Sequence, residues 1–291
     1  MKKIYYWGPF VDNNIATVKA IYNSALSINR YSEKFEAFIL NNIGEWDFLI
    51  NQKNNYLFHN IGKNILRFLP KYGFLKSRFS YLIIFFYSFF RLKNKIKKSK
   101  PDFLIIHLIV SLPLILFSIF KFETKLILRI SGKPKLNFFR LYLWKLCSKN
   151  IYKIFCPTEA TMKFLIQKKI FDEKKIFLVK DPVFTLDNLK KAKNLKEVIN
   201  DEFAEDNIIL AGRLTKQKNF NLIIDAVNLD PKLYEGLKIF IFGEGELRSD
   251  LEKKIKFNNL ENKIFIKGYV KDIYKYFKKS RLFIIISLWE D

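Results

Sequence analysis

Residues 208–220 read Ile208-Ile209-Leu210-Ala211-Gly212-Arg213-Leu214-Thr215-Lys216-Gln217-Lys218-Asn219-Phe220. The apolar run at the start predicts a buried strand that ends at Gly212, where a residue without a side chain lets the backbone turn closely. Arg213 then offers a planar fork of donors suited to phosphate, and Lys218 adds a mobile positive charge. Apolar residues recur at helical spacing afterwards, at Phe220, Leu222, Ile223, Ala226 and Val227. We therefore predict a phosphate site where the strand gives way to a helix, whose N-terminal amides and dipole would face the same anion.

The same alternation of apolar runs and helical spacing extends through both halves of the chain. It predicts a doubly wound parallel sheet in each half, and so an α/β fold. The predicted strands are Ile4–Trp7, Phe35–Leu40, Phe103–Ile106, Leu126–Ile130, Ile154–Cys156 and Ile176–Val179, then Ile208–Ala211, Lys238–Phe242, Ile264–Lys267 and Leu282–Ile286. The predicted helices of the first half are Ala16–Ser27, Tyr81–Phe90, Leu114–Phe120, Phe138–Ser148 and Thr158–Gln167, the last two with start signals at Asn137 and Pro157.

A polar stretch rich in Lys, Asn, Asp and Glu separates the two halves. It predicts an N-terminal domain over residues 1–185, a linker over residues 186–206 and a C-terminal domain over residues 207–291. A chain of 291 residues is long enough for two such domains with cores of their own.

Four short motifs of the C-terminal half carry a family resemblance. They are Gly212-Arg213-Leu214 with Lys218, Gly243-Glu244-Gly245-Glu246-Leu247, Gly268-Tyr269-Val270 and Ser287-Leu288-Trp289-Glu290. Together they resemble the retaining glycosyltransferases of family 4, the glycosyl transferases group 1. The resemblance continues more loosely through Arg129–Pro134 and Cys156–Glu159. It implies the GT-B fold, in which two Rossmann-like domains face a cleft.

The resemblance implies a donor site made by the C-terminal domain. Arg213 and Lys218 match residues that bind the diphosphate of a nucleotide sugar, where they stabilise the charge of the leaving group. Glu290 matches the first residue of a paired-glutamate element that hydrogen-bonds the donor sugar. The remaining donor-binding matches are Gly212, Gly243, Gly245, Glu246 and Leu247 beside the nucleotide, with Tyr269 and Val270 near its base. The alternative interpretations are a solvated surface pair for Arg213 and Lys218, an exposed carboxylate for Glu290 and plain turns for the glycines.

Three residues of the N-terminal domain are acceptor-side candidates. Gly8 ends the first predicted strand and would let the next loop approach a ligand, although a plain turn is equally consistent. His107 follows another strand and would contact sugar, but a lone histidine in an apolar run more often belongs to the core. Ser131 stands where many members of the family carry a histidine, a departure that concerns the acceptor chemistry.

The resemblance implies that the family's second glutamate and the helices closing the C-terminal domain lie beyond Asp291. We therefore expect a truncated second domain, with weak or no activity if the chain is complete. A degenerate remnant that no longer turns over is the corresponding alternative function.

The composition limits the kinds of partner and cofactor that the protein is expected to bind. With 52 Lys and Arg against 28 Asp and Glu, the formal net charge is +24, which predicts attraction to phosphorylated substrates, anionic lipid or nucleic acid. A nucleic-acid-binding protein ranks low, because the basic residues are spread over both halves and no recognition motif is present. No Asp-x-Asp motif occurs and the two histidines are too few for most metal sites, so we expect a metal-independent reaction without a cofactor.

The sequence predicts a cytoplasmic protein that meets the inner face of the cell membrane peripherally. Cys147 and Cys156 suit a reducing compartment, and Lys2–Gly8 is too short an apolar run for a signal peptide. Phe103–Phe120 is nearly long enough to span a bilayer, but His107 and Pro113 favour a strand followed by a core helix. Ile61–Lys76 mixes basic and apolar residues, which predicts an element lying on anionic lipid near a lipid-linked glycan acceptor, or else a partly solvated helix.

Overall fold

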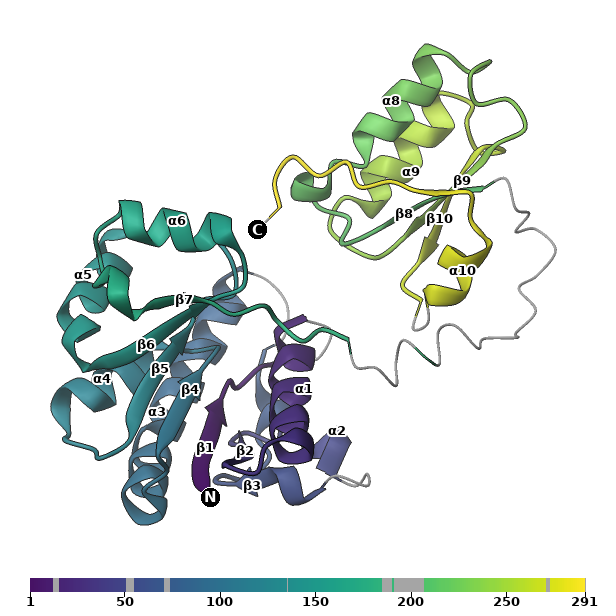
Figure 1. The fold of residues 1–291 in the computed structure, drawn as a ribbon. Helices are drawn as coiled ribbons and strands as arrows, with labels where there is room; N and C mark the ends of the chain where they lie inside the picture. The colour runs from purple at the N-terminus through teal and green to yellow at the C-terminus, as the bar shows by residue number, and fades with distance from the viewer. Residues whose placement is uncertain are drawn as a thin grey trace. The chain divides into compact units, whose positions relative to one another are not determined.

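The computed structural model describes residues 1–12, 16–50, 55–70, 74–134, 136–184, 190, 207–270 and 273–290. The chain divides into two compact units, Met1–Thr185 (unit 1) and Leu186–Glu290 (unit 2), which are described separately (Figure 1). The predicted linker lies outside the described residues apart from Lys190.

Unit 1 is built on a parallel sheet of seven strands in the order β3-β2-β1-β4-β5-β6-β7. The central strands are near-continuous apolar runs, as expected for strands covered on both faces. The strands are β1 (Lys2–Trp7), β2 (Phe35–Asn41), β3 (Phe58–Asn60), β4 (Phe103–Ile106), β5 (Lys125–Arg129), β6 (Ile151–Cys156) and β7 (Ile176–Leu178).

Helices cover both faces of this sheet. The connection from β3 to β4 crosses back over β2 and β1, so a right-handed crossover places the next helices opposite α1. One core cluster accordingly joins α1 to β1, through Ile21 and Tyr6, whereas another joins the later helices to the sheet, through Leu92, Trp144 and Leu165. The helices are α1 (Ala16–Tyr31), α2 (Asp47–Ile50), α3 (Phe74–Ser99), α4 (Ser111–Ile119), α5 (Phe138–Cys147) and α6 (Glu159–Gln167).

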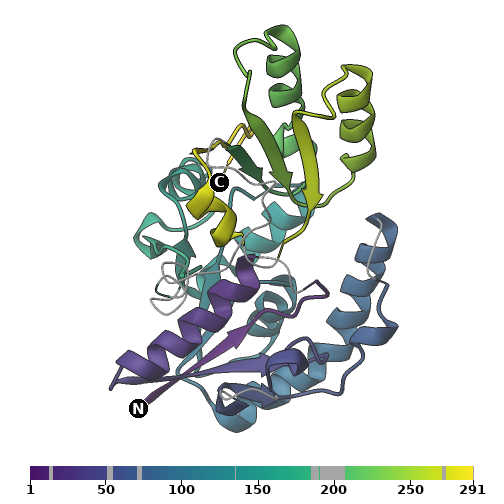
Figure 2. The ribbon, with the colours of Figure 1, turned by 90° about the vertical axis from the view of Figure 1, so that its right-hand side faces the viewer.

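Unit 2 repeats this design with a four-stranded parallel sheet in the order β10-β9-β8-β11. One core cluster packs α8 and α9 on one face of the sheet, and a smaller one packs α10 on the other, as Figure 2 shows. The strands are β8 (Asn207–Ala211), β9 (Lys238–Phe242), β10 (Ile264–Gly268) and β11 (Leu282–Phe283), and the helices are α8 (Asn221–Leu229), α9 (Arg248–Phe257) and α10 (Tyr274–Lys279).

Several predicted elements differ from the structure at their ends. Strand β3 was not predicted, and α3 is far longer than the predicted Tyr81–Phe90, because Lys and Arg beyond its apolar centre are good helix formers. Helix α6 is capped by the side chain of Thr158, which accepts from the N–H of Thr161 at 3.2 Å, rather than begun by Pro157. Strand β11 ends at Phe283, three residues earlier than predicted.

Two segments considered for membrane contact have defined structures. Phe103–Phe120 forms β4 and α4, as predicted. Among the residues that the structure describes, no helix is both long and apolar enough to cross a bilayer. The alternative of a helix over Ile61–Lys76 is wrong for residues 61–70, which hold only a 3-10 turn at Leu66–Phe68, whereas Phe74–Lys76 form the first turn of α3.

Candidate functional site

The predicted donor-site residues of unit 2 follow the carboxyl ends of its four strands. Because parallel strands end on one edge of a sheet, residues from all four connections meet there, and this edge is where ligands of such sheets bind. The residues are Gly212, Arg213 and Lys218 after β8, Gly243 to Leu247 after β9, Tyr269 and Val270 after β10, and Glu290 after β11. We call this the strand-end site.

Backbone hydrogen bonds join the first two of these connections. The N–H of Gly212 donates to the carbonyl of Phe242 at 2.9 Å, and the N–H of Leu214 donates to the carbonyl of Glu244 at 3.0 Å. A third hydrogen bond runs in the opposite direction, from the N–H of Leu247 in the second connection to the carbonyl of Leu214 at 3.0 Å. The turn that carries Arg213 is therefore held by main-chain contacts on both sides.

The predicted glycines have a packing role in this network. Gly243 has φ +146°, which other residues rarely adopt, and a Cβ there would overlap the carbonyl oxygen of Gly212. A Cβ at Gly245 would likewise overlap the carbonyl oxygen of Leu214. These two glycines thus let the turns after β8 and β9 approach backbone to backbone.

Lys218 and Glu290 form an ion pair across the site although they lie 72 residues apart in sequence. The hydrogen bond from Lys218 lowers the pKa of the Glu290 carboxyl. Two further contacts fix the segment after β11, because Leu288 N–H donates to the carbonyl of Gln217 at 2.8 Å and Gln217 Nε2 donates to the carbonyl of Trp289 at 3.1 Å. The structure therefore brings together two of the three predicted catalytic residues.

The stem of Lys218 crosses the Gly212 turn, since a Cβ at Gly212 would lie 3.3 Å from both Lys218 Cγ and Cδ. Arg213 stands next to that turn with an exposed side chain, and no hydrogen bond or ion pair of its guanidinium is found among the described residues. Glu246 and Tyr269 are also exposed. Within the described part of the site, the Arg213 guanidinium is therefore without a partner, and the Lys218 ammonium is neutralised by a carboxylate.

The acceptor-side candidates of unit 1 are mostly buried. Gly8 packs closely, since a Cβ there would lie 2.6 Å from Ile21 Cδ1 and 3.4 Å from His107 Cβ. His107 is 7% exposed, and among the described residues neither ring nitrogen has a hydrogen-bond partner. Burial, together with the charge of Arg129, lowers the pKa of His107 to about 3, so the ring is neutral at ordinary pH. Ser131 is exposed just after β5.

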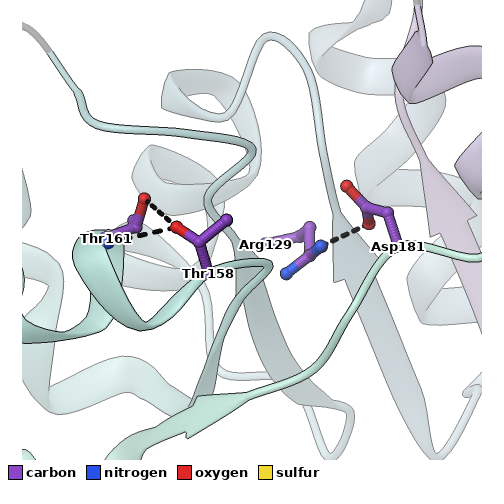
Figure 3. A network of polar contacts seen from close by, with 4 residues as sticks. All are labelled: Arg129, Thr158, Thr161 and Asp181. Atoms are coloured by element: carbon purple, nitrogen blue, oxygen red, sulfur yellow. Dashed lines mark hydrogen bonds and ion pairs between the residues drawn. The ribbon is translucent and has the colours of Figure 1, made fainter. Parts of the chain in front are cut away.

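Arg129, the last residue of β5, was not among the predicted site residues. It is 3% exposed, and its Nε donates to Asp181 Oδ1 at 3.0 Å while Nη2 forms an ion pair with the same oxygen. Figure 3 shows the guanidinium between Asp181 and Thr158, the residue that caps α6. Its Nη1 is buried without a partner among the described residues. The sequence signal that could have identified Arg129 was its position as a basic residue at the end of the apolar run of β5.

Asp181 lies in the segment that follows β7, and a second bond holds that segment. Asn23 Nδ2 donates to the carbonyl of Pro182 at 2.7 Å. Within unit 1, the chain leaving the sheet is therefore anchored to both β5 and α1.

Within the described part of the chain, no group of three or more His, Cys, Asp or Glu side chains is placed to hold a metal ion. The cationic groups of the strand-end site, Arg213 and Lys218, are instead suited to an anionic ligand.

Comparisons with known proteins agree with the parallel-sheet α/β fold described above. Residues 192–291 match the family model of the glycosyl transferases group 1. An uncharacterised glycosyltransferase of Methanocaldococcus jannaschii is 29% identical over 222 residues, which cover 69% of this chain and 53% of the relative. The GalNAc-α-(1→4)-GalNAc-α-(1→3)-diNAcBac-PP-undecaprenol α-1,4-N-acetyl-D-galactosaminyltransferase of Campylobacter jejuni is 27% identical, over 77% of this chain and 58% of that protein.

This chain thus spans about half the length of the curated relatives it matches. Among solved structures, a TarM variant of S. aureus in complex with fondaparinux, α-GlcNAc-glycerol and UDP is similar with a TM-score of 0.67 at 13% identity, covering 99% of this chain and 81% of TarM. The second unit thus carries a match to the glycosyl transferases group 1, and the parallel-sheet α/β fold of the chain is that of the GT-B glycosyltransferases.

Proposed function

We propose that this protein transfers a sugar from a nucleotide-sugar donor to a glycan acceptor, with retention of the anomeric configuration. The observation that carries the proposal is the pairing of Lys218 with Glu290 at the strand-end site whose first turn also carries Arg213. The match of residues 192–291 to the family model of the glycosyl transferases group 1 supports the same reaction class.

The charges of the site suit the chemistry of the reaction. Transfer breaks the bond between the sugar and a diphosphate, so negative charge grows on the leaving group. Arg213 and Lys218 would stabilise that charge by charge-assisted hydrogen bonds, without a metal ion. Glu290 would exchange its contact with Lys218 for a hydroxyl group of the donor sugar. The ion pair in the structure is then the resting arrangement of the site.

The relatives suggest the substrates. The similar TarM structure contains UDP, and the Campylobacter relative is named for a glycan carried on diphospho-undecaprenol. We therefore propose a UDP- or GDP-linked donor, with Tyr269 and Val270 near the base. We further propose a lipid-linked glycan acceptor used in surface polysaccharide or lipopolysaccharide synthesis. The protein would then be cytoplasmic and would work peripherally at the inner face of the membrane, where it reaches such an acceptor. No nucleic-acid partner is proposed.

The test is calorimetric titration of the protein with UDP, GDP and a DNA oligonucleotide, at two salt concentrations and without added metal. One nucleotide should bind saturably. Replacement of Arg213 or Lys218 by Ala should weaken that binding by roughly 1.5–3 kcal/mol, the range of charge-assisted bonds.

Lys216→Ala is the matched control, because Lys216 is an exposed lysine of the same turn that has no assigned contact with the donor. It should leave the affinity nearly unchanged. Equal affinity of the wild type and both site variants would overturn the donor-site assignment. Salt-sensitive binding of DNA alone would overturn the proposed function.

A further inference from the structure

Helix α5 carries large apolar side chains on both of its sides. Trp144 and Cys147 are buried in the core of unit 1. The opposite side is exposed to solvent, with Phe138 at 76%, Phe139 at 80%, Tyr142 at 63% and Leu146 at 59%. Single exposed apolar residues are ordinary, but four of them on one ten-residue helix form a patch that calls for a partner.

Helix α3 repeats the pattern. Its inner side is buried through residues such as Ile84, Leu92 and Ile96. Its outer side shows the helical spacing again, with Phe79 exposed by 59%, Leu82 by 52%, Phe86 by 71% and Phe90 by 65%. The α3 side chains named here lie within the described part of that helix.

The two stripes lie on one side of the sheet. Helices α3, α4 and α5 pack into the same core cluster, and α4 contacts both of the others (Figure 1). We call the outer sides of α3 and α5 together the outer face; its apolar members are Phe79, Leu82, Phe86, Phe90, Phe138, Phe139, Tyr142 and Leu146.

The charge of this layer is of one sign. Helices α3, α4 and α5 contain no Asp or Glu, whereas Arg and Lys flank the apolar stretch of α3 and lie among the apolar residues of α5. Lys93 illustrates the arrangement, with its Nζ 5.8 Å from the ring centroid of Phe90 and 4.2 Å from that of Phe120. On α5, Arg140 and Lys145 lie within the aromatic stretch. A partner of this face must accept aromatic rings and also be negatively charged.

We propose that the outer face docks on a lipid bilayer that contains anionic lipids. Aromatic and leucine side chains enter the boundary between head groups and acyl chains, while Lys and Arg meet the phosphates of the head groups. The proposal rests on the proposed function in one respect, since a lipid-linked acceptor gives such a protein a reason to be at the membrane. It also names the contact surface on unit 1.

This surface is distinct from the segment that sequence patterning suggested. In the described part of Ile61–Lys76, Leu69 is buried, and Ile65 and Leu66 pack against the core of unit 1. Phe68 is the exposed aromatic residue there, at 69%. Most apolar side chains of residues 61–70 are therefore used inside the protein and are not offered to lipid.

The test is sedimentation of the protein with vesicles of phosphatidylcholine alone or mixed with phosphatidylglycerol. Wild type should bind the mixed vesicles, with lower affinity at high salt. A variant with Phe138→Ser, Phe139→Ser and Tyr142→Ser, and another with Phe86→Ser and Phe90→Ser, should each lose at least about tenfold in affinity. Because these side chains are exposed, the thermal midpoint should not fall.

The matched control replaces exposed apolar residues of unit 2, Leu229 and Phe257, which are 88% and 86% exposed, by Ser. It should bind mixed vesicles as the wild type does. Equal vesicle binding by all variants, or no vesicle binding by the wild type, would overturn the proposal. A dimer that only the outer-face variants dissociate, without vesicle binding, would assign the face to a second copy instead. UDP titration of the same variants separates the two proposals, because the outer face should not change nucleotide affinity.

Discussion

Replacement of Glu290 by Gln should strengthen the binding of UDP, whereas replacement of its partner Lys218 by Ala should weaken it. In the structure the carboxylate of Glu290 neutralises the ammonium that the diphosphate would use. A diphosphate must therefore displace Glu290 before it can pair with Lys218. The glutamine variant removes that competition and leaves the size of the side chain unchanged.

The magnitude follows from the exposure of the pair. The side chain of Lys218 is 24% exposed and that of Glu290 is 48% exposed, so solvent screens their attraction. Pairs of this kind are worth about 0.2–1 kcal/mol. The Kd for UDP should accordingly fall by about 1.5- to 5-fold in Glu290→Gln, against a rise of about 10- to 160-fold in Lys218→Ala. Both effects should shrink at high salt.

Calorimetry with UDP and with UDP-sugars separates the affinity for the nucleotide diphosphate from the additional affinity contributed by the sugar. If Glu290 contacts the donor sugar, its replacement should remove the additional affinity for the UDP-sugar while improving that for UDP. Glu261→Gln is the control for a general charge effect, because Glu261 is an exposed carboxylate of unit 2 that lies before β10, outside the strand-end site, and has no ion pair among the described residues. Weaker UDP binding in Glu290→Gln, comparable to that in Lys218→Ala, would refute the reasoning and show that Glu290 positions the lysine.

Three stability measurements test other features. Gly243→Ala should lower the free energy of unfolding by about 1–3 kcal/mol and weaken UDP binding, because of its φ of +146° and its contact with Gly212; Gly236→Ala, with φ +73° and nothing within 4 Å, should show only the backbone strain and no effect on UDP. Burial raises the pKa of the Glu45 carboxyl from 4.5 to about 7, so the folded state binds the proton more tightly than the unfolded state does, and this residue should make stability fall by about 3 kcal/mol as pH rises from 4.5 to 7. Urea unfolding across that range should show this slope in the difference between wild type and Glu45→Gln. The difference cancels the opposite contribution of the buried His107 and the half-buried His59, whose pKa values are lowered to about 3 and about 4. No difference in slope would contradict the prediction. Asp181→Asn should cost about 3 kcal/mol by leaving the buried Arg129 unpaired, and the double variant with Arg129→Gln should recover part of it; a double variant less stable than Asp181→Asn alone would speak against the pairing.

The sheets could be predicted because their strands are apolar runs bounded by turns. Strand β4 matches its prediction at both ends, and Asn137 caps α5 as expected, accepting from the N–H of Arg140 at 2.8 Å. Strand β3 has only three residues and too short a pattern to stand out from its surroundings. The predictable part of the fold is therefore the part in which local pattern and burial agree.

The candidate site was predictable as a set of strand ends but not as a set of contacts. Sequence patterning placed Lys218 and Glu290 in separate loops, and their pairing depends on how β8 and β11 lie beside each other. Arg129 and Asp181 are 52 residues apart, and their bond likewise arises from tertiary structure. No local signal in the sequence distinguishes such partners from other charged residues, because they come close to each other only after the chain has folded.

The backbone contact between Gly212 and Gly243 has a consequence for how chains of this kind diverge. Gly243 cannot accept a side chain unless the Gly212 turn moves, because a Cβ there would overlap the carbonyl oxygen of Gly212, so a glycine at 243 is tied to the path of that turn. Variation is left to Glu246 and Tyr269, whose exposed side chains can change without disturbing that contact. A lineage could therefore explore new bases and sugars at these positions while inheriting the phosphate-binding turn intact.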